Sequence, residues 1–387
     1  MGWSSWNTFA HHIDEAVIRE TADALVATGL RDLGYRYLNI DDHYQGGRDA
    51  DGRITHHPER FPGGIRALAD YVHERGLKFG LYSDAAERTC GGEVASYGNE
   101  DLDAQTFADW QIDYLKYDYC HAPEDRGAAV RRYTAMGRAL RATGRDIVFN
   151  VCEWGGRQPW EWAAQAGAHM WRTTGDICDS WQGGSGVYEH GIEEIGFELQ
   201  RGLERHAGPG RWNDPDMLVV GMRGRGNVAG SMGFAGCTDD EYRTHFALWC
   251  MLAAPLIIGA DVRSLDDVSL EILSNDELIA VDQDGLGRQG RRVATRDGLE
   301  IWLKPLLFGD VAVGLFNRRD AEASATASWA DLDITGQYVV RDLSTHKDLG
   351  VRGGSSASVD ADLPPHGCAV FRLTPQGDAE AAVHRPG

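Results

Sequence analysis

The sequence feature that most limits how this chain folds is an alternation of short β-rich segments with helical segments. Each β-rich segment is a short apolar run that ends in polar residues, and an amphipathic helical pattern separates it from the next. The eight predicted strands are residues 1–6, 35–41, 78–84, 114–119, 147–153, 170–174, 211–217 and 256–261. This alternation predicts a closed parallel (β/α)8 TIM barrel, whose chemistry lies at the carboxyl ends of its strands.

The pattern changes after about residue 285. Residues 299–303, 311–316, 338–340 and 368–371 form short apolar runs without helical segments between them. Such runs are typical of a C-terminal antiparallel β-sandwich domain. We therefore expect a catalytic barrel over residues 1–285, a β-sandwich over 286–375 and a flexible polar tail over 376–387.

The charge balance narrows the classes of partner. The chain has 38 Lys and Arg residues against 59 Asp and Glu residues, a net charge of −21. This charge repels nucleic acid and anionic membrane surfaces, so neither is an expected partner. Nothing in the sequence calls for a cofactor, and it leaves homo-oligomerisation open.

The start of the chain and its cysteines indicate the cellular compartment of the protein. We expect a cytoplasmic protein, because the first residues resemble no signal peptide and no run of apolar residues is long enough to span a bilayer. The seven cysteines lack the spacing of a zinc site. Mostly reduced thiols are expected.

Carboxylates stand at the ends of seven of the eight predicted strands. They are Asp41, Asp42, Asp84, Asp118, Glu153, Asp176, Asp216 and Asp261. Because strand ends converge at one mouth of a barrel, these residues predict an acidic pocket that suits either a metal ion or a sugar. For Asp84, Asp216 and Asp261, a structural role such as helix capping is an equally good interpretation.

The residues beside these acids favour a sugar over a metal. They are aromatic or cationic: Trp3, Trp6, Tyr82, Trp154, Trp171, Lys116 and Arg172. Aromatic rings pack on the apolar face of a pyranose, and charged groups bind its hydroxyls. Histidine patterns typical of metal sites, such as HxH and HExxH, are missing from the sequence. No metal is therefore expected.

Sugar hydrolysis needs one ionised and one protonated carboxyl group. Lys116 and Asp118 are two positions apart on one predicted strand and so share its inward face. The lysine ammonium should keep Asp118 ionised, as a nucleophile requires. Asp176 lies at another strand end, where partial enclosure by aromatic side chains would raise its pKa toward that of a general acid.

These motifs resemble those of glycoside hydrolase family 27, in which α-galactosidases predominate. The matching blocks span nearly the whole chain: MGWSSWNTF, YLNIDD, KFGLYSDAAERTCGG, DAQTFADWQIDYLKYDYC, CEWGG, WRTTGDICDSW, GPGRWNDPDMLVVG and AAPLIIGADVR. The resemblance implies a retaining exo-α-galactosidase without a cofactor, acting on oligosaccharides with terminal α-galactose. It also implies that Asp118 is the nucleophile and Asp176 the general acid/base.

The resemblance further assigns substrate contacts. Asp41 and Asp42 would bind O6 and O4 of galactose, and Lys116 would bind O3 and O4. Tyr82 would line the sugar subsite and Trp6 would pack on the sugar face. The residues expected around the 2-hydroxyl are Cys152, Glu153, Trp154 and Arg172. Cys90 and Cys120 correspond to a pair that forms a disulfide in some relatives.

Three alternatives remain open at this point. A related exo-glycosidase, chiefly a β-L-arabinopyranosidase, would have the same motifs, although Asp41 is short enough to leave room for the C6 hydroxymethyl of galactose. The intact Cys152 to Trp154 block should exclude an acetamido group at C2. A metal-dependent barrel hydrolase and a non-catalytic sugar-binding protein are the other two alternatives.

Overall fold

The computed structural model describes residues 1–184 and 189–377. Contacts divide the chain into two compact units, which we describe separately. The barrel unit consists of Met1–Gly191, Gly210–Gly236 and Pro255–Asp266. The second unit consists of Ile192–Pro209, Cys237–Ala254 and Asp267–Gly387, of which 378–387 lie outside the described residues. The predicted domain boundary at residue 285 stays a prediction.

The barrel unit is built on a parallel sheet of eight strands. Its order is β10-β1-β2-β5-β6-β7-β8-β9. The strands are β1 (Gly2–Ser4), β2 (Tyr37–Asn39), β5 (Lys78–Asp84), β6 (Tyr114–Asp118), β7 (Val148–Val151), β8 (Met170–Arg172), β9 (Trp212–Asp214) and β10 (Ile257–Ile258). Each lies inside one of the eight predicted segments.

The barrel closes between β9 and β10, the two ends of this sheet order. Leu218, just beyond β9, pairs in parallel with Ile258 of β10. The backbone N–H of Leu218 donates to Ile257 O at 2.8 Å, and that of Gly259 donates to Leu218 O at 2.8 Å. The predicted TIM barrel is therefore confirmed.

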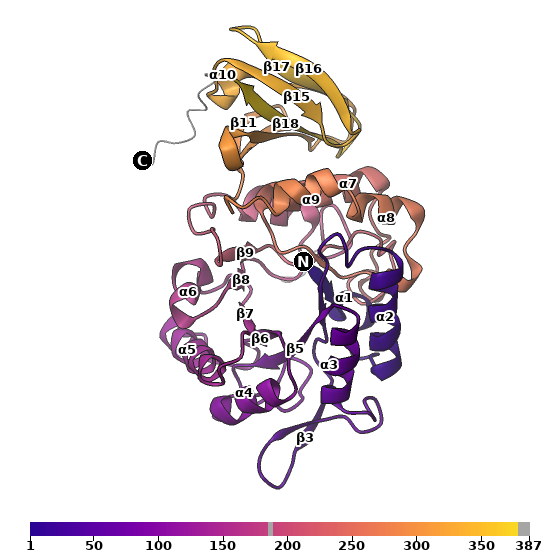
Figure 1. The fold of residues 1–387 in the computed structure, drawn as a ribbon, viewed down its shortest axis with the longest axis vertical. Helices are drawn as coiled ribbons and strands as arrows, with labels where there is room; N and C mark the ends of the chain where they lie inside the picture. The colour runs from indigo at the N-terminus through magenta and orange to yellow at the C-terminus, as the bar shows by residue number, and fades with distance from the viewer. Residues whose placement is uncertain (185–188, 378–387) are drawn as a thin grey trace. The chain divides into compact units, whose positions relative to one another are not determined.

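Helices surround the strands of the barrel unit (Figure 1). They are α1 (Trp6–Phe9), α2 (Glu15–Ala27), α3 (Ile65–Glu74), α4 (Glu100–Asp109), α5 (Arg126–Ala142) and α6 (Ala163–Ala166). α2 begins where the Asp14 side chain accepts the Val17 N–H at 2.8 Å, a typical N-cap. α3 buries Leu68 and Val72 and ends before Gly76, whose φ of 71° favours glycine.

A small hairpin that the sequence analysis did not predict follows β2. It pairs β3 (Gln45–Arg48) with β4 (Ile54–His56). Gly52 occupies the turn with a φ of 79°, a conformation that favours glycine. The Asp51-Gly52 pair was the available signal, because this dipeptide is typical of hairpin turns.

The second unit contains two antiparallel sheets and four α-helices among its described residues. The six-stranded sheet has the order β11-β12-β13-β18-β15-β16, and β14 pairs with β17. The strands are β11 (Arg291–Arg296), β12 (Leu299–Pro305), β13 (Val311–Asn317), β14 (Ala323–Ser328), β15 (Gln337–Asp342), β16 (Lys347–Gly353), β17 (Ser358–Leu363) and β18 (Cys368–Gln376). The helices are α7 (Asp239–Leu252), α8 (Asp267–Leu273), α9 (Asp276–Asp282) and α10 (Trp329–Leu332).

One apolar core joins the two sheets of this unit. Val313 of β13, Tyr338 of β15 and Val359 of β17 are fully buried in the same cluster, together with Trp329 of α10. This shared core is that of a sandwich, which confirms the predicted C-terminal fold. Gln376, predicted to start a flexible tail, belongs to β18, and Gly377 follows it; residues 378–387 of that tail lie outside the described residues.

No helix among residues 1–184 and 189–377 has the length and apolar character needed to cross a membrane.

Gly137 provides a test of the packing of α5. A Cβ atom at this position would overlap the backbone oxygen of Ala166 in α6. Gly137→Ala should therefore lower the free energy of unfolding by about 1–3 kcal/mol, as overpacking does. Urea denaturation followed by tryptophan fluorescence measures this change.

Gly127, in the same helix, is the matched control. A Cβ there would lie 3.1 Å from Asp125 Oδ2 and 3.2 Å from Arg131 Nη1, and both of these side chains are exposed and have room to shift slightly. Gly127→Ala should leave stability unchanged or slightly increase it, because alanine has the higher helix propensity. Equal destabilisation by both variants would contradict the packing argument.

Candidate active site

A single pocket brings together most of the residues that the sequence analysis selected. It encloses about 410 Å³ of empty space, counting the part open to solvent. Its lining is Trp6, Asn7, Asp41, Asp42, Tyr82, Cys90, Lys116, Asp118, Trp154, Arg172, Asp176, Asp216 and Met217. All of these residues belong to the barrel unit, and most follow the carboxyl ends of strands. A concave site with several convergent polar groups is typical of small-ligand binding.

Asp118 is the last residue of β6 and is only 4% exposed. Its Oδ1 accepts the backbone N–H of Tyr119 at 3.0 Å. Burial raises the pKa of Asp118 to about 7; Lys116 acts against this rise, and the Asp176 carboxylate adds to it. Lys116 therefore lowers the pKa of Asp118, as predicted, but burial raises this pKa by more.

Lys116 makes its ion pair with Asp41 rather than with Asp118. Its Nζ donates to Asp41 Oδ2 at 2.9 Å, and both side chains are largely buried. Asp41 is fixed further, because its backbone N–H donates to Ser5 Oγ at 3.0 Å and its Oδ1 accepts the Asp42 N–H at 2.9 Å. Asp42 in turn accepts the Gly91 N–H at 2.8 Å. This side of the pocket is a fixed set of hydrogen-bonding groups for hydroxyls.

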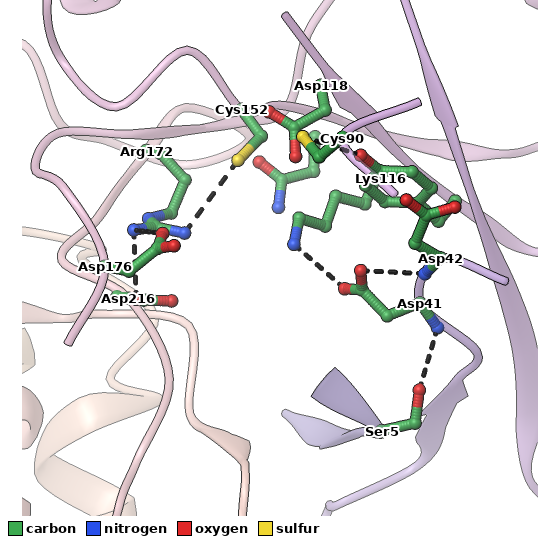
Figure 2. A network of polar contacts seen from close by, with 12 residues as sticks. Ser5, Asp41, Asp42, Cys90, Lys116, Asp118, Cys152, Arg172, Asp176 and Asp216 are labelled. Carbon is green, nitrogen blue, oxygen red and sulfur yellow. Dashed lines mark hydrogen bonds and ion pairs between the residues drawn. The ribbon is translucent and has the colours of Figure 1, made fainter. Parts of the chain in front are cut away.

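Arg172 organises the opposite side of the pocket, as Figure 2 shows. Its Nη2 lies 3.1 Å from Asp176 Oδ1 and 2.9 Å from Asp216 Oδ2. Burial raises the pKa of Asp216 to about 6, although Arg172 acts in the opposite direction. Asp216, for which a structural role was equally expected, therefore lies in the pocket.

Asp176 differs from its predicted environment. We expected enclosure by aromatic side chains, whereas the side chain is 42% exposed and paired with Arg172. Asp176 comes after the end of β8, on the segment that leads out of the barrel, so solvent reaches it.

Three of the five predicted aromatic residues line the pocket, and two do not. Trp6, Tyr82 and Trp154 are in the lining. Trp3 is fully buried and donates its indole N–H to Ala260 O at 2.8 Å; Trp171 is likewise buried, with its N–H on Asn213 Oδ1 at 2.8 Å. Because side chains alternate along a strand, Trp3 and Trp171 support the barrel instead of the ligand site.

The residues expected around the 2-hydroxyl also divide into two groups. Trp154 and Arg172 line the pocket, and Cys152 lies behind Arg172, with Arg172 Nη1 at 3.8 Å from its Sγ. Glu153 is fully buried and turned to Arg157, whose backbone N–H lies 2.9 Å and whose Nη1 lies 3.2 Å from Glu153 Oε2. Glu153 therefore does not reach the pocket lining in this structure.

Two further strand-end carboxylates lie outside the pocket lining. Asp261 caps a short 3-10 helix and pairs with Arg263 at 2.8 Å, the structural role considered for it. Asp84, at the end of β5, is fully buried, and its Oδ2 accepts the Cys120 N–H at 2.9 Å. Burial, with the neighbouring Asp118 charge, raises the pKa of Asp84 to about 9.

Two pocket residues were not predicted from the sequence, and whether one cysteine pair is bonded was undecided. Asn7 and Met217 line the pocket, and their place inside the blocks MGWSSWNTF and NDPDML was the available signal. Cys90 and Cys120 form a disulfide with a Cα–Cα distance of 5.1 Å. The other five cysteines form no disulfide.

Comparisons with known proteins agree with this geometry. A family model described as Alpha galactosidase A matches residues 1–284, and one described as Alpha galactosidase C-terminal beta sandwich domain matches residues 296–373. The chain is 44% identical over 381 residues to an alpha-galactosidase of Cyamopsis tetragonoloba, covering 97% of this chain and 86% of that one. It is 41% identical over 392 residues to alpha-galactosidase A of Cellvibrio japonicus, covering 97% and 92% of the two chains.

A solved structure shows the same fold over the full length. The crystal structure of alpha-galactosidase I from Mortierella vinacea superposes with a TM-score of 0.89 at 34% identity, covering 97% of this chain and 96% of that one. The chain therefore belongs to the α-galactosidase family of glycoside hydrolases, family 27.

Proposed function

We propose that this enzyme removes terminal α-D-galactosyl residues from oligosaccharides with retention of configuration. The observation that carries the proposal is that Asp118 and Asp176 line one pocket, together with the fixed groups Lys116, Asp41 and Arg172. Two carboxyl groups across one sugar-sized pocket are the minimum for double-displacement hydrolysis of a glycoside.

In the first step, Asp118 attacks C1 of galactose while Asp176 donates a proton to the glycosidic oxygen. The C1–O bond to the leaving group breaks, and an ester bond forms between C1 and the Asp118 carboxylate. The product of this step is a β-galactosyl-enzyme and a free alcohol. The Tyr119 N–H, which lies 3.0 Å from Asp118 Oδ1, holds one oxygen in place and leaves the other to attack.

In the second step, Asp176 removes a proton from water as the water attacks C1 from the face that the leaving group occupied. The ester bond breaks, Asp118 returns to a carboxylate, and α-galactose leaves. The 42% exposure of Asp176 supports this double role, because an exposed carboxyl group can exchange protons with an entering water. Two inversions at C1 give net retention.

The remaining pocket groups orient the sugar. Asp41 and Asp42 supply acceptors for O6 and O4, and Lys116 supplies a donor for O3 and O4. Trp6 offers a ring for the apolar face of galactose, with Tyr82 beside it. Arg172 donates to the 2-hydroxyl, where a hydrogen bond that strengthens in the transition state lowers the barrier.

Azide rescue assigns the two carboxyl groups. Asp118→Ala should lose more than about 10³-fold in kcat/KM on an aryl α-galactoside, because no nucleophile remains. Azide should restore turnover in both Asp118→Ala and Asp176→Ala by entering the space of the missing carboxylate. The stereochemistry differs: Asp118→Ala should give β-galactosyl azide by one inversion, and Asp176→Ala should give α-galactosyl azide by two. NMR of the products distinguishes them, and the opposite assignment would exchange the two roles.

The pH profile tests the electrostatics of Asp118. Because attack requires the ionised carboxylate and burial raises its pKa to about 7, kcat/KM should fall as the pH drops through about 7. The Asp176 charge contributes to that raised pKa. In Asp176→Asn the fall should therefore move to lower pH, when measured on an aryl galactoside whose leaving group needs no protonation.

Asp32→Asn is the control for this shift, because it also removes one negative charge but its side chain is 69% exposed and pairs with Arg31. Its profile should match that of the unsubstituted enzyme. A profile for Asp176→Asn that is unchanged, or that moves to higher pH, would show that the two carboxyl groups do not interact as proposed.

A panel of nitrophenyl glycosides tests substrate choice. We expect α-galactoside to have the highest kcat/KM, because Asp41 can bind the C6 hydroxyl that β-L-arabinopyranoside lacks. α-N-Acetylgalactosaminide should not be cleaved, because Trp154 and Arg172, which line the pocket where the 2-hydroxyl is expected, should clash with an acetamido group. A higher kcat/KM on the arabinopyranoside would reassign the enzyme to that alternative within its family.

A further inference from the structure

We propose that reduction of the Cys90–Cys120 disulfide creates an inhibitory zinc site, made of these two thiolates and the carboxylates of Asp84 and Asp118. The site goes beyond the proposed hydrolysis, for which no metal is needed. Its effect on activity rests on the proposed role of Asp118 as nucleophile, whereas zinc binding itself does not. The two can therefore be tested separately.

The four side chains already lie at nearly the spacing of zinc ligands. One potential ligand atom from each of Asp84, Cys90, Asp118 and Cys120 lies within 4.8 Å of all the others. Zinc binds thiolate sulfur at about 2.3 Å and carboxylate oxygen at about 2.0–2.2 Å, so tetrahedral ligands lie about 3.3–3.8 Å apart. Figure 2 shows Cys90 beside Asp118. The two sulfur atoms, bonded to each other in this structure, would separate on reduction to reach this spacing.

The backbone fixes the positions of these four residues. Asp84 of β5 and Asp118 of β6 are directly paired across the sheet. The Cα atoms of Cys90 and Cys120 are 5.1 Å apart, and the Cys120 N–H is bonded to Asp84 Oδ2 at 2.9 Å. Breaking the disulfide therefore leaves Cys120 held beside Asp84. A preorganised ligand set loses little conformational freedom when it binds a metal ion.

Asp84 provides an independent indication of a ligand. It is fully buried, and its Oδ1 has no hydrogen-bond partner among the described residues. A buried carboxylate oxygen is normally satisfied by a donor or a metal ion. The disulfide form supplies neither, and a zinc ion coordinated by the four residues would supply the missing partner.

Access and charge favour a cation at this place. Cys90 is exposed and lines the galactose pocket, so both a reductant and a metal ion can reach it. The same pocket is lined by the carboxylates of Asp41, Asp42, Asp176 and Asp216. Acidic walls concentrate divalent cations. Two thiolates with two carboxylates form a set that selects zinc over magnesium or calcium, which prefer oxygen ligands alone.

The chemistry is a two-electron reduction followed by metal binding. A small dithiol reduces the Cys90–Cys120 bond to two thiols and becomes a cyclic disulfide itself, so that two electrons and two protons pass to the protein. Zn²⁺ then displaces the two thiol protons, any protons on the Asp84 and Asp118 carboxyl groups, and some of its own water ligands. The cytoplasm, where the sequence analysis expects this chain, keeps thiols reduced and would favour the first step.

Bound zinc would stop hydrolysis directly. Coordination occupies the Asp118 carboxylate that must attack C1, and the added positive charge disfavours the oxocarbenium-like transition state. Galactose and zinc should therefore compete for the pocket. The disulfide form, which has no thiolates to offer, should be insensitive to zinc, so that the disulfide protects the nucleophile from metal ions.

The test uses the full chain in its disulfide form and in a form reduced with a dithiol, which is then removed without air because it also binds zinc. Competition with a chromogenic chelator measures zinc binding. We expect one zinc ion per reduced chain, bound at least 100-fold more tightly than by the disulfide form, and weakened by galactose. Cadmium in place of zinc should give the ultraviolet band of cadmium–thiolate bonds.

Four variants identify the ligands in the reduced form. Cys120→Ser, Asp84→Asn and Asp118→Asn should each weaken zinc binding at least tenfold. His11→Gln, which removes an exposed histidine outside the proposed ligand set, should leave the affinity unchanged. Equal affinity of both redox forms, or unchanged affinity in Cys120→Ser and Asp84→Asn, would overturn the site.

Activity is measured in parallel, with each sample compared with itself in the presence of a strong chelator. Zinc should inhibit the reduced enzyme at least tenfold, the chelator should restore it, and the disulfide form should be unaffected. Zinc bound by the four residues without inhibition would overturn the blocking step and would also contradict Asp118 as nucleophile. Loss of activity on reduction that the chelator does not reverse, without zinc binding, would show that the disulfide has only a structural role.

Discussion

The structure around the pocket depends on one electrostatic constraint: many carboxylates share a small, largely buried space with two cations. Lys116 is paired with Asp41, and Arg172 is shared between Asp176 and Asp216. An unpaired buried charge is far more costly than a paired one, so each cation fixes the position of the acids beside it. Among the described residues, Asp118 and Asp42 are paired with neither cation, and burial raises the pKa of Asp118 to about 7.

The parallel barrel is what makes this crowding possible. Because all eight strands run in the same direction, every strand end delivers its side chains to the same mouth. Asp41 comes from the end of β2, Asp118 from β6, and Arg172 from β8, although 131 residues of sequence separate the first from the last. The apolar strand interiors, with residues such as Leu38, Leu81 and Leu115 fully buried, hold these ends in register.

The region behind Asp118 has a second layer of constraint. Asp84 binds the backbone after Asp118 through the Cys120 N–H, and the Cys90–Cys120 disulfide joins the same backbone to the loop that follows β5. That loop also supplies the Gly91 N–H to Asp42. One short segment therefore connects Asp118 to the side of the pocket formed by Asp41 and Asp42. Reduction of the disulfide in this segment would therefore affect both.

The sequence alone determined the fold class and most of the pocket, because both depend on local periodicity. The polar residues that end each apolar run identified the strand ends that carry Asp41, Asp118 and Arg172, and the i, i+2 rule gave the inward face shared by Lys116 and Asp118. Only the tertiary structure decided which partner each group takes. Lys116 selects Asp41, Glu153 turns to Arg157, and Asp216 joins the pocket through Arg172. Burial and most of these pairs depend on how strands far apart in sequence come together. The pKa of Asp118 depends on them too, so a local sequence pattern cannot predict it.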